Sequence, residues 1–382
     1  MLRLSGWLYA NGKFREGSIG IEAGVISEVN RSRARQPLAS GLILPAFTNA
    51  HTHAGDAVVR EELIGTLDEL VAPPHGLKHR ILSKSSDENV IAASHEYLER
   101  MFASGTANFW DFREMGLRGV RQLYAATLGL PLRPLVFGRP AKMEYDREEV
   151  AAILRACDGI GISSLLDWDA DDAAKLARDS HAAGKAFATH ASERVREDVD
   201  DVLDLKPDLL VHLTEATDGD LARIADADVP VAVCPRSNAF FGKLPDLPRL
   251  IRSGVRLRLG TDNAMINAPS MFRELDFAWK LAQLKGGVPP HVLLDAALNG
   301  RKGLTDPGDV ALSPGDPADV IVVDVPGGTP TIGGVFRCGE ADLAFVGIGG
   351  RTWVRERRGL AELPPRVRPG PRRKPLRRTR GR

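Results

Sequence analysis

Eight short apolar runs with the look of β-strands recur along the middle of the chain, and polar stretches separate them. Between most of the runs, apolar residues recur with helical spacing, and each such stretch opens with an acidic or hydroxyl residue suited to a helix N-cap. Regular alternation of strand and helix over eight units predicts a parallel (β/α)8 barrel, an α/β TIM barrel, across residues 46–307. A doubly wound open sheet is the alternative. The strand-like runs are 42–47, 106–111, 133–137, 159–164, 185–190, 208–212, 229–234 and 256–261, and the clearest helical stretches are 146–156, 169–183 and 217–227.

Both ends of the chain carry a different pattern, in which apolar and polar residues alternate and turn residues such as Asn-Gly intervene. This pattern predicts antiparallel strands. Neither end has enough apolar surface for a core of its own, so residues 1–45 and 308–360 are expected to form one small β-sandwich domain beside the barrel. The glycines of 347–350 are expected to form a hairpin turn. Residues 361–382 are rich in Pro and Arg and are expected to be disordered.

The amino-acid composition excludes several classes of protein. The chain is 43% hydrophobic and 26% charged, which excludes a disordered chain, a collagen or a small disulfide scaffold. Residues 351–382 hold 13 Lys and Arg against 2 Asp and Glu, whereas residues 1–350 hold 38 against 48, so an acidic body carries a basic tail. No apolar run approaches the roughly 18 residues of a membrane span, and the start lacks a signal-peptide core. A cytoplasmic protein with no membrane partner is therefore expected.

Candidate chemistry gathers where the predicted strands end, which is the face on which barrel enzymes place their active sites. His51 and His53 are spaced i and i+2, so that both imidazoles project to the same side of an extended segment. His190, His212 and Asp262 end three later strands. Imidazoles and a carboxylate suit a borderline divalent metal, most often zinc, with a position left for water. The three cysteines are far apart and indicate neither a disulfide framework nor a cysteine metal site.

With these motifs the chain resembles the amidohydrolase superfamily, and in particular its mononuclear branch of cytosine, guanine, adenosylhomocysteine and chlorotriazine hydrolases. The resemblance covers about residues 1–355. It rests on an ordered set of motifs, namely the His-x-His of His51 and His53, His190-x-x-Glu193, His212, Cys234-Pro-Arg-Ser-Asn238, Gly260-Thr-Asp-Asn263 and Gly315-Asp-Pro-Ala-Asp319.

The resemblance implies a metal held by His51, His53, His190 and Asp262, with Glu193 moving protons and His212 orienting the water and polarising the substrate. Asp262 would also hold the attacking hydroxide or accept its proton. Binuclear members use a carboxylated Lys at the end of strand 4, and the stretch from Gly159 to Asp169 contains no Lys. One divalent ion per chain is therefore expected, with Zn²⁺ first and Fe²⁺ or Mn²⁺ as alternatives.

These features together predict a metal-dependent hydrolase of non-peptide carbon–nitrogen bonds that acts on a small molecule. The favoured reaction is hydrolytic deamination of a small heterocyclic amine by metal-bound hydroxide, and hydrolysis of a cyclic or linear amide is the alternative. The Arg-Gly and Trp-Leu that shape the nucleobase pocket in many deaminating members are missing. Candidate substrate contacts are Asp56, Lys78, His79 and Arg139. A nucleic-acid-associated scaffold that uses the basic tail is a rival of a different class, and self-association is left open.

Overall fold

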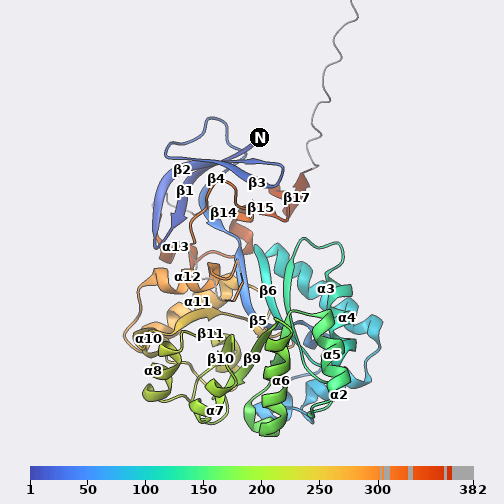
Figure 1. Ribbon diagram of the computed structural model, residues 1–382. Coiled ribbons are helices and arrows are strands. Elements are labelled where there is room, and N and C mark those ends of the chain that lie inside the picture. The colour runs from blue at the N-terminus through green and yellow to red at the C-terminus, as the bar shows by residue number, and fades with distance from the viewer. Residues whose placement is uncertain (302, 305–309, 326–329, 357–358, 364–382) are drawn as a thin grey trace, which may run out of the picture.

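The computed structural model describes residues 1–301, 303–304, 310–325, 330–356 and 359–363. A parallel barrel forms its larger part, and a smaller sheet stands at one end of the barrel (Figure 1). Residues 361–382 were predicted to be disordered, and of these, residues 364–382 lie outside the described residues. Residues 361–363 contradict this prediction, because they belong to a strand that ends at Leu363, three residues beyond the predicted domain limit.

The barrel is built from strands whose hydrogen-bonded order begins and ends in one stretch of chain. That order is β12-β11-β10-β9-β8-β7-β6-β5-β13, and β12 and β13 are successive parts of residues 256–263. The sheet therefore closes on itself as an eight-stranded (β/α)8 barrel, as predicted. The strands are β5 (Phe47–His53), β6 (Thr106–Arg113), β7 (Arg133–Gly138), β8 (Gly159–Ile162), β9 (Ala186–Ala191), β10 (Leu209–His212), β11 (Pro230–Val233), β12 (Arg256–Leu259) and β13 (Asp262–Asn263).

The first barrel strand differs from the prediction. Residues 42–47 were expected to form it, but they straddle two strands, β4 (Ala39–Pro45) of the small sheet and β5 of the barrel. Only Ala46 separates the two, and its backbone N–H donates to the carbonyl oxygen of Asp319 at 2.9 Å. The Pro45–Ala46 junction is thus where the chain leaves one sheet for the other, and it places the His-x-His motif at the end of β5.

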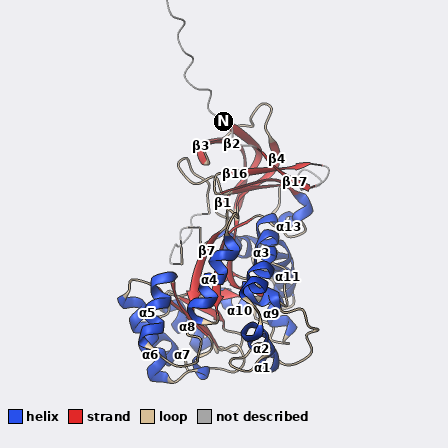
Figure 2. Cartoon of the chain, turned by 90° about the vertical axis from the view of Figure 1, so that its right-hand side faces the viewer, coloured by secondary structure: helices blue, strands red, loops and turns tan. Residues whose placement is uncertain are grey.

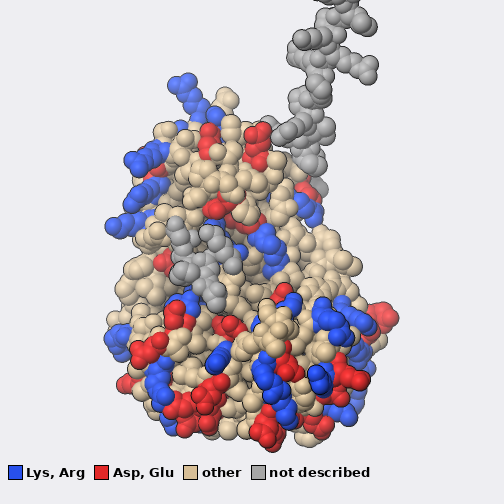
Figure 3. Space-filling view, viewed as in Figure 1, with Lys and Arg blue, Asp and Glu red and all other residues tan. Residues whose placement is uncertain are grey.

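Helices surround the barrel, and further helices lie in the loops that follow its strands (Figure 2). The predicted caps are formed, since Asp146, Asp169 and Thr217 each accept a hydrogen bond from a backbone N–H in the first turn of the next helix. Acidic and basic side chains interleave over the outer helices in Figure 3. The outer helices are α3 (Asp87–Ala103), α4 (Gly116–Thr127), α5 (Arg147–Ala156), α6 (Ala170–Ala182), α7 (Val199–Asp204), α8 (Asp218–Asp226), α10 (Leu247–Arg252), α11 (Met271–Gln283) and α12 (Pro290–Leu298). The helices in these loops are η1 (Ala54–Val58), α1 (Leu67–Leu70), α2 (Leu77–Lys84), η2 (Leu165–Asp167) and α9 (Pro235–Phe240), with α13 (Ile332–Val335) and η3 (Glu340–Asp342) near the small sheet.

The small sheet joins both ends of the chain, as predicted. It is one continuous, mostly antiparallel sheet in which β1 and β4 pair in parallel. It curves around a core that includes Leu4, Ile19, Ile43 and Phe345. The glycines at 349 and 350 form the predicted hairpin turn with positive φ angles. Its strand order is β17 (Gly359–Leu363), β16 (Arg351–Glu356), β15 (Leu343–Ile348), β14 (Val320–Val323), β4, β1 (Leu2–Ala10), β2 (Lys13–Glu22) and β3 (Val25–Asn30).

The interior of the barrel is filled with apolar side chains that form the floor of the site. Trp110, Phe112, Phe137 and Val211 are buried there, and the Phe112 ring lies 4.6 Å from the His51 ring, centroid to centroid. Because β5 enters the barrel from the small sheet and the strands are parallel, the strand ends that carry the polar residues lie at the opposite end of the barrel. Among the described residues, no helix is both long and apolar enough to cross a membrane.

Candidate metal centre

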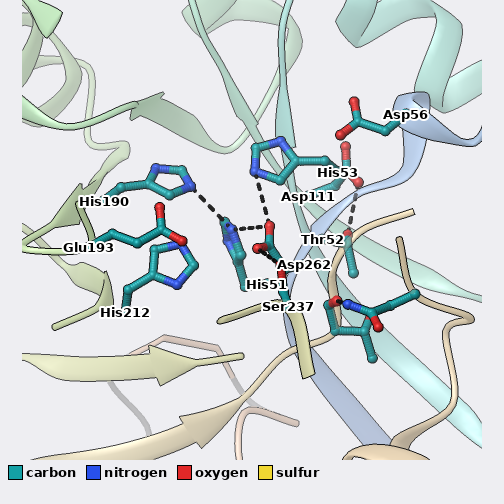
Figure 4. Close-up of polar contacts among 12 residues, drawn as sticks. His51, Thr52, His53, Asp56, Asp111, His190, Glu193, His212, Ser237 and Asp262 are labelled. Carbon is teal, nitrogen blue, oxygen red and sulfur yellow. Dashed lines mark hydrogen bonds and ion pairs between the residues drawn. The ribbon is translucent and has the colours of Figure 1, made fainter. Parts of the chain in front are cut away.

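Four strand ends deliver the polar side chains of the site. His51 and His53 come from β5, His190 from β9, His212 from β10 and Asp262 from β13 (Figure 4). His212 and Asp262 have φ angles of 79° and 60°, a left-handed conformation uncommon outside glycine. Such backbone geometry costs free energy and persists where the surrounding structure holds it, which is frequent at functional sites.

The imidazole nitrogens and the carboxylate converge on one point. His51 Nε2 lies 3.2 Å from His190 Nε2 and 3.3 Å from Asp262 Oδ1. The Nε2 atom of His53 lies 3.6 Å from the same oxygen. Two overlapping groups have ligand atoms that all lie within 4.8 Å of one another, namely His51, His53 and His190, and His51, His212 and Asp262.

Burial decides the charge of these groups. It lowers the pKa of His51 and His190, and together with nearby Lys78 it lowers that of His53 to about 4, so the three rings are neutral. The His190 Nδ1–H donates to the Ile162 carbonyl at 2.9 Å, which leaves its Nε2 lone pair free. Burial would raise the pKa of Asp262, but contact with His51 holds it well below its usual value. Ser237 Oγ also donates to Asp262 Oδ2 at 2.6 Å and favours the ionised form.

This donor set fits a divalent cation. Two imidazole nitrogens lie 3.2 Å apart, and a buried carboxylate oxygen lies 3.3 Å from one of them, so several possible ligand atoms surround one point. Nitrogen and oxygen donors in this number are typical of a catalytic zinc site. The second nitrogen of His53, Nδ1, lies 3.0 Å from Glu114 Oε1, and carboxylates commonly orient metal-binding histidines in this way.

Glu193 and His212 lie next to each other on the His190 side of His51 (Figure 4). His212 Nε2 is 3.4 Å from Glu193 Oε1. The amide nitrogen of Asn238, on α9, lies 3.2 Å from the same oxygen and 3.1 Å from His212 Nδ1. Burial and the charge of Asp262 raise the pKa of Glu193 to about 8. A carboxyl with such a pKa both takes up and releases a proton near neutral pH.

A second layer of charge lies behind His53. Lys78 Nζ is 2.8 Å from Glu114 Oε1 and 3.3 Å from Asp56 Oδ2. Arg139 approaches Glu114 at 3.6 Å. All four side chains are buried. Since a buried charge is tolerated only with partners, Glu114 is the common partner that links His53 to the two cations.

Some of the predicted site residues line a cavity beside the strand ends, and others do not. His53, His190, Glu193, His212 and Asp262 line it. Of the predicted substrate contacts, Lys78 and Arg139 also line it. The other two predicted contacts are not among the lining residues: Asp56 is fully buried and pairs with Lys78, and His79 Nε2 lies 3.1 Å from the Val71 carbonyl oxygen.

Sequence reasoning gave no role to Glu114, Ser237 or Asn238. Glu114 directly follows β6, so the strand-end rule that found the histidines could also have found this residue. Ser237 and Asn238 lie in the first turn of α9, which begins just after the end of β11. Their contacts with Asp262 and Glu193 appear only when the barrel is closed.

Comparisons with known proteins agree with this geometry. A family model described as "Amidohydrolase family" matches residues 140–354. A protein of Methanothermobacter thermautotrophicus named "Putative aminohydrolase" is 32% identical, over 87% of this chain and 92% of that protein. A 5-methylthioadenosine/S-adenosylhomocysteine deaminase of Moorella thermoacetica is 27% identical, over 74% of this chain and 73% of its own length. An adenosine deaminase of Xanthomonas campestris, solved with bound zinc, has a similar fold, with a TM-score of 0.78, 18% identity and coverage of 95% and 94% of the two chains.

Proposed function

The chain belongs to the amidohydrolase family, and from that premise we propose that it is a metal-dependent hydrolase of non-peptide carbon–nitrogen bonds that deaminates a small heterocyclic amine. The observation that carries the proposal is the convergence of three imidazoles and the Asp262 carboxylate beside the Glu193 carboxyl. All of these side chains except His51 line one cavity. The deaminase names of the relatives favour this reaction over amide hydrolysis.

In this proposal His51, His53, His190 and Asp262 hold one divalent ion, with Zn²⁺ as the first choice. Such an ion would lower the pKa of bound water to about 7 and so supply a nucleophile at neutral pH. Ser237 holds the second oxygen of Asp262, and Glu114 holds the second nitrogen of His53, so that two of the four side chains keep their orientation.

Glu193 is the proton carrier in this proposal. Its carboxyl lies at the cavity wall three residues after His190, where it takes a proton from the attacking water and returns it to the leaving amine. Its raised pKa, about 8, suits both directions of transfer. His212 Nε2 lies 3.4 Å from Glu193 Oε1, and in this proposal it polarises the substrate atom under attack.

Lys78 and Arg139 are the proposed substrate contacts, since both are buried and both reach the cavity wall. Leu67, Val71 and Pro73, from the segment that follows β5, add apolar surface to the wall. A planar ring with polar substituents on one edge fits such a combination of surfaces.

The test is ammonia release from a panel of purines, pyrimidines, pterins and triazines by the metal-loaded protein. A His51→Ala/His53→Ala variant should lose metal and activity together, whereas His181→Ala, on the outer helix α6, should lose neither. Ring opening without ammonia would replace deamination by amide hydrolysis. A metal-loaded protein that hydrolyses neither class of compound would overturn the proposal.

A further inference from the structure

We propose that Asp111 is a positioning residue for the metal site: by holding Thr52, it locks an irregularity in β5 that turns His51 into the barrel. This inference rests on the metal site of the proposed function. It goes beyond that proposal because it explains how the His-x-His segment acquires its shape. It also gives a role to a buried carboxyl that the proposed reaction does not use.

The irregularity is a β-bulge in the pairing of β5 with β6. Asn49 pairs with Phe109. The next pair along the two strands is Thr52 with Asp111, so two residues separate the paired positions on β5, whereas only Trp110 separates them on β6. One extra residue in one of two paired strands defines a β-bulge, and bulges beside active sites re-aim side chains.

The bulge brings two successive side chains to the inner face of the barrel. Ala50 belongs to the apolar cluster that fills the barrel, together with Trp110 and Phe112. His51 follows it directly, and its ring also faces inward, 4.6 Å from the Phe112 ring, centroid to centroid. Neighbours in a regular strand point to opposite faces of the sheet. Without the extra residue, His51 would point toward the outer helices and away from His190.

Asp111 holds β5 at the point where regular pairing resumes after the bulge (Figure 4). Its Oδ2 accepts from Thr52 Oγ1 at 2.8 Å and from the backbone N–H of Ala54 at 2.7 Å, so the two donors flank His53. Thr52 Oγ1 also lies 3.1 Å from the Trp110 carbonyl oxygen. A backbone N–H can only donate, so Oδ2 is the acceptor both in an ionised carboxyl and in one with its proton on Oδ1. The clamp therefore does not depend on the charge of Asp111.

Both sides of the bulged segment are fixed. Arg113 Nε lies 3.6 Å from Asp111 Oδ1, and both side chains are fully buried, so the carboxyl has a second partner that holds its orientation. On the other side of β5, Gly260 lies against the backbone of His51, and a Cβ atom on Gly260 would lie 2.6 Å from the His51 backbone nitrogen. Glycine is typical of a place where another backbone approaches this closely. The backbone of His51 is thus confined between two strands, and the register of β5 decides where its ring points.

The experiment is a chelator titration of Co²⁺-loaded, full-length protein, followed by visible absorption, which reports the number and arrangement of the ligands. Thr52→Val keeps the shape of the side chain but removes the hydroxyl, so Co²⁺ affinity should fall about tenfold and the absorption bands should change. Asp111→Ala removes both contacts and should cost about 100-fold, the upper end of the usual range for groups that orient metal ligands. Thr52→Ser restores the hydroxyl and should restore both affinity and spectrum.

The matched control is Thr48→Val, the same change in the same strand before the bulge, where the hydroxyl lies 3.5 Å from Asn108 Nδ2. It should leave affinity and spectrum unchanged. Thr52→Val with wild-type affinity and spectrum would overturn the proposal, and so would an equal loss in Thr48→Val. If Asp111→Ala does not fold, Thr52→Val still decides, because it leaves the pair of Asp111 and Arg113 intact. Wild-type protein that binds Co²⁺ but hydrolyses no substrate would contradict the proposed function and leave this inference standing, whereas wild-type protein that binds no Co²⁺ would contradict both.

Discussion

Replacement of Glu114 tests whether the buried charges behind the site set its affinity for metal. Glu114 Oε1 lies 3.0 Å from His53 Nδ1 and 2.8 Å from Lys78 Nζ. Loss of such an outer partner typically costs 10- to 100-fold in metal affinity, which is about 1.4–2.7 kcal/mol. Glu114→Gln keeps an oxygen that can accept, so it should lie near the tenfold end, and Glu114→Leu should lie near the hundredfold end.

The same change has a separate effect on folding. Lys78 is 3% exposed, and without Glu114 its carboxylate partner among the described residues is Asp56, at 3.3 Å, next to His53 Nδ1 at 3.4 Å. Removal of one partner from a buried ion pair costs about 3–5 kcal/mol of unfolding free energy. The remaining contact with Asp56 should hold the loss near the lower end. A Glu114→Gln/Lys78→Met double variant removes the unpaired cation, so it should regain most of this stability but not the metal affinity.

Two assays separate these effects. Zinc affinity is measured by competition with a chelator, and stability is measured by urea unfolding of metal-free protein. The control is Glu96→Gln, because Glu96 forms an exposed ion pair with Arg60 at 3.4 Å, and such pairs contribute about 0–1 kcal/mol. Wild-type zinc affinity in both Glu114 variants would refute the role given to this carboxylate.

Three further predictions follow from the fold and the site. Glu193→Gln keeps the shape of the proton carrier but removes its charge, so metal content should be unchanged and turnover should fall by about 10²-fold or more; near-normal turnover would exclude Glu193 from the mechanism. Asp146→Ala removes the acceptor of the Glu149 N–H at 2.8 Å and should cost about 1 kcal/mol in urea unfolding, with activity unchanged. Deletion of residues 364–382 begins after β17 and beyond every site residue, so turnover should be retained. Any binding of the full-length chain to polyanions should weaken as salt is raised and should be lost on deletion. Loss of turnover would show that the domain boundary is wrong.

The barrel could be predicted because each strand and helix carries its own pattern. The stretches 146–156, 169–183 and 217–227 lie within one residue of α5, α6 and α8 at each end, since an N-cap side chain and an apolar stripe mark each helix locally. The first strand was misplaced because residues 42–47 are extended on both sides of Ala46. An apolar pattern shows that a segment is extended but not which sheet it joins.

The part of the candidate site that lies at strand ends could also be predicted. Strand-end histidines and Asp262 are brought together by barrel closure, so their meeting follows from the fold. The positions of Asp56 and His79 do not follow from it, because both lie in the segment after β5, whose short helices bury one and turn the other toward Val71. The partners Glu114 and Asn238 act through contacts between segments far apart in the chain, which no local pattern encodes.

The metal content of the purified chain tests the central claim most directly. Elemental analysis of full-length protein, alongside His51→Ala/His53→Ala and the control His181→Ala, gives the number of metal ions per chain. The account predicts about one divalent ion in the wild type and in His181→Ala, and none in the double variant. Two tightly held ions per chain, or one ion that persists without His51 and His53, would contradict it.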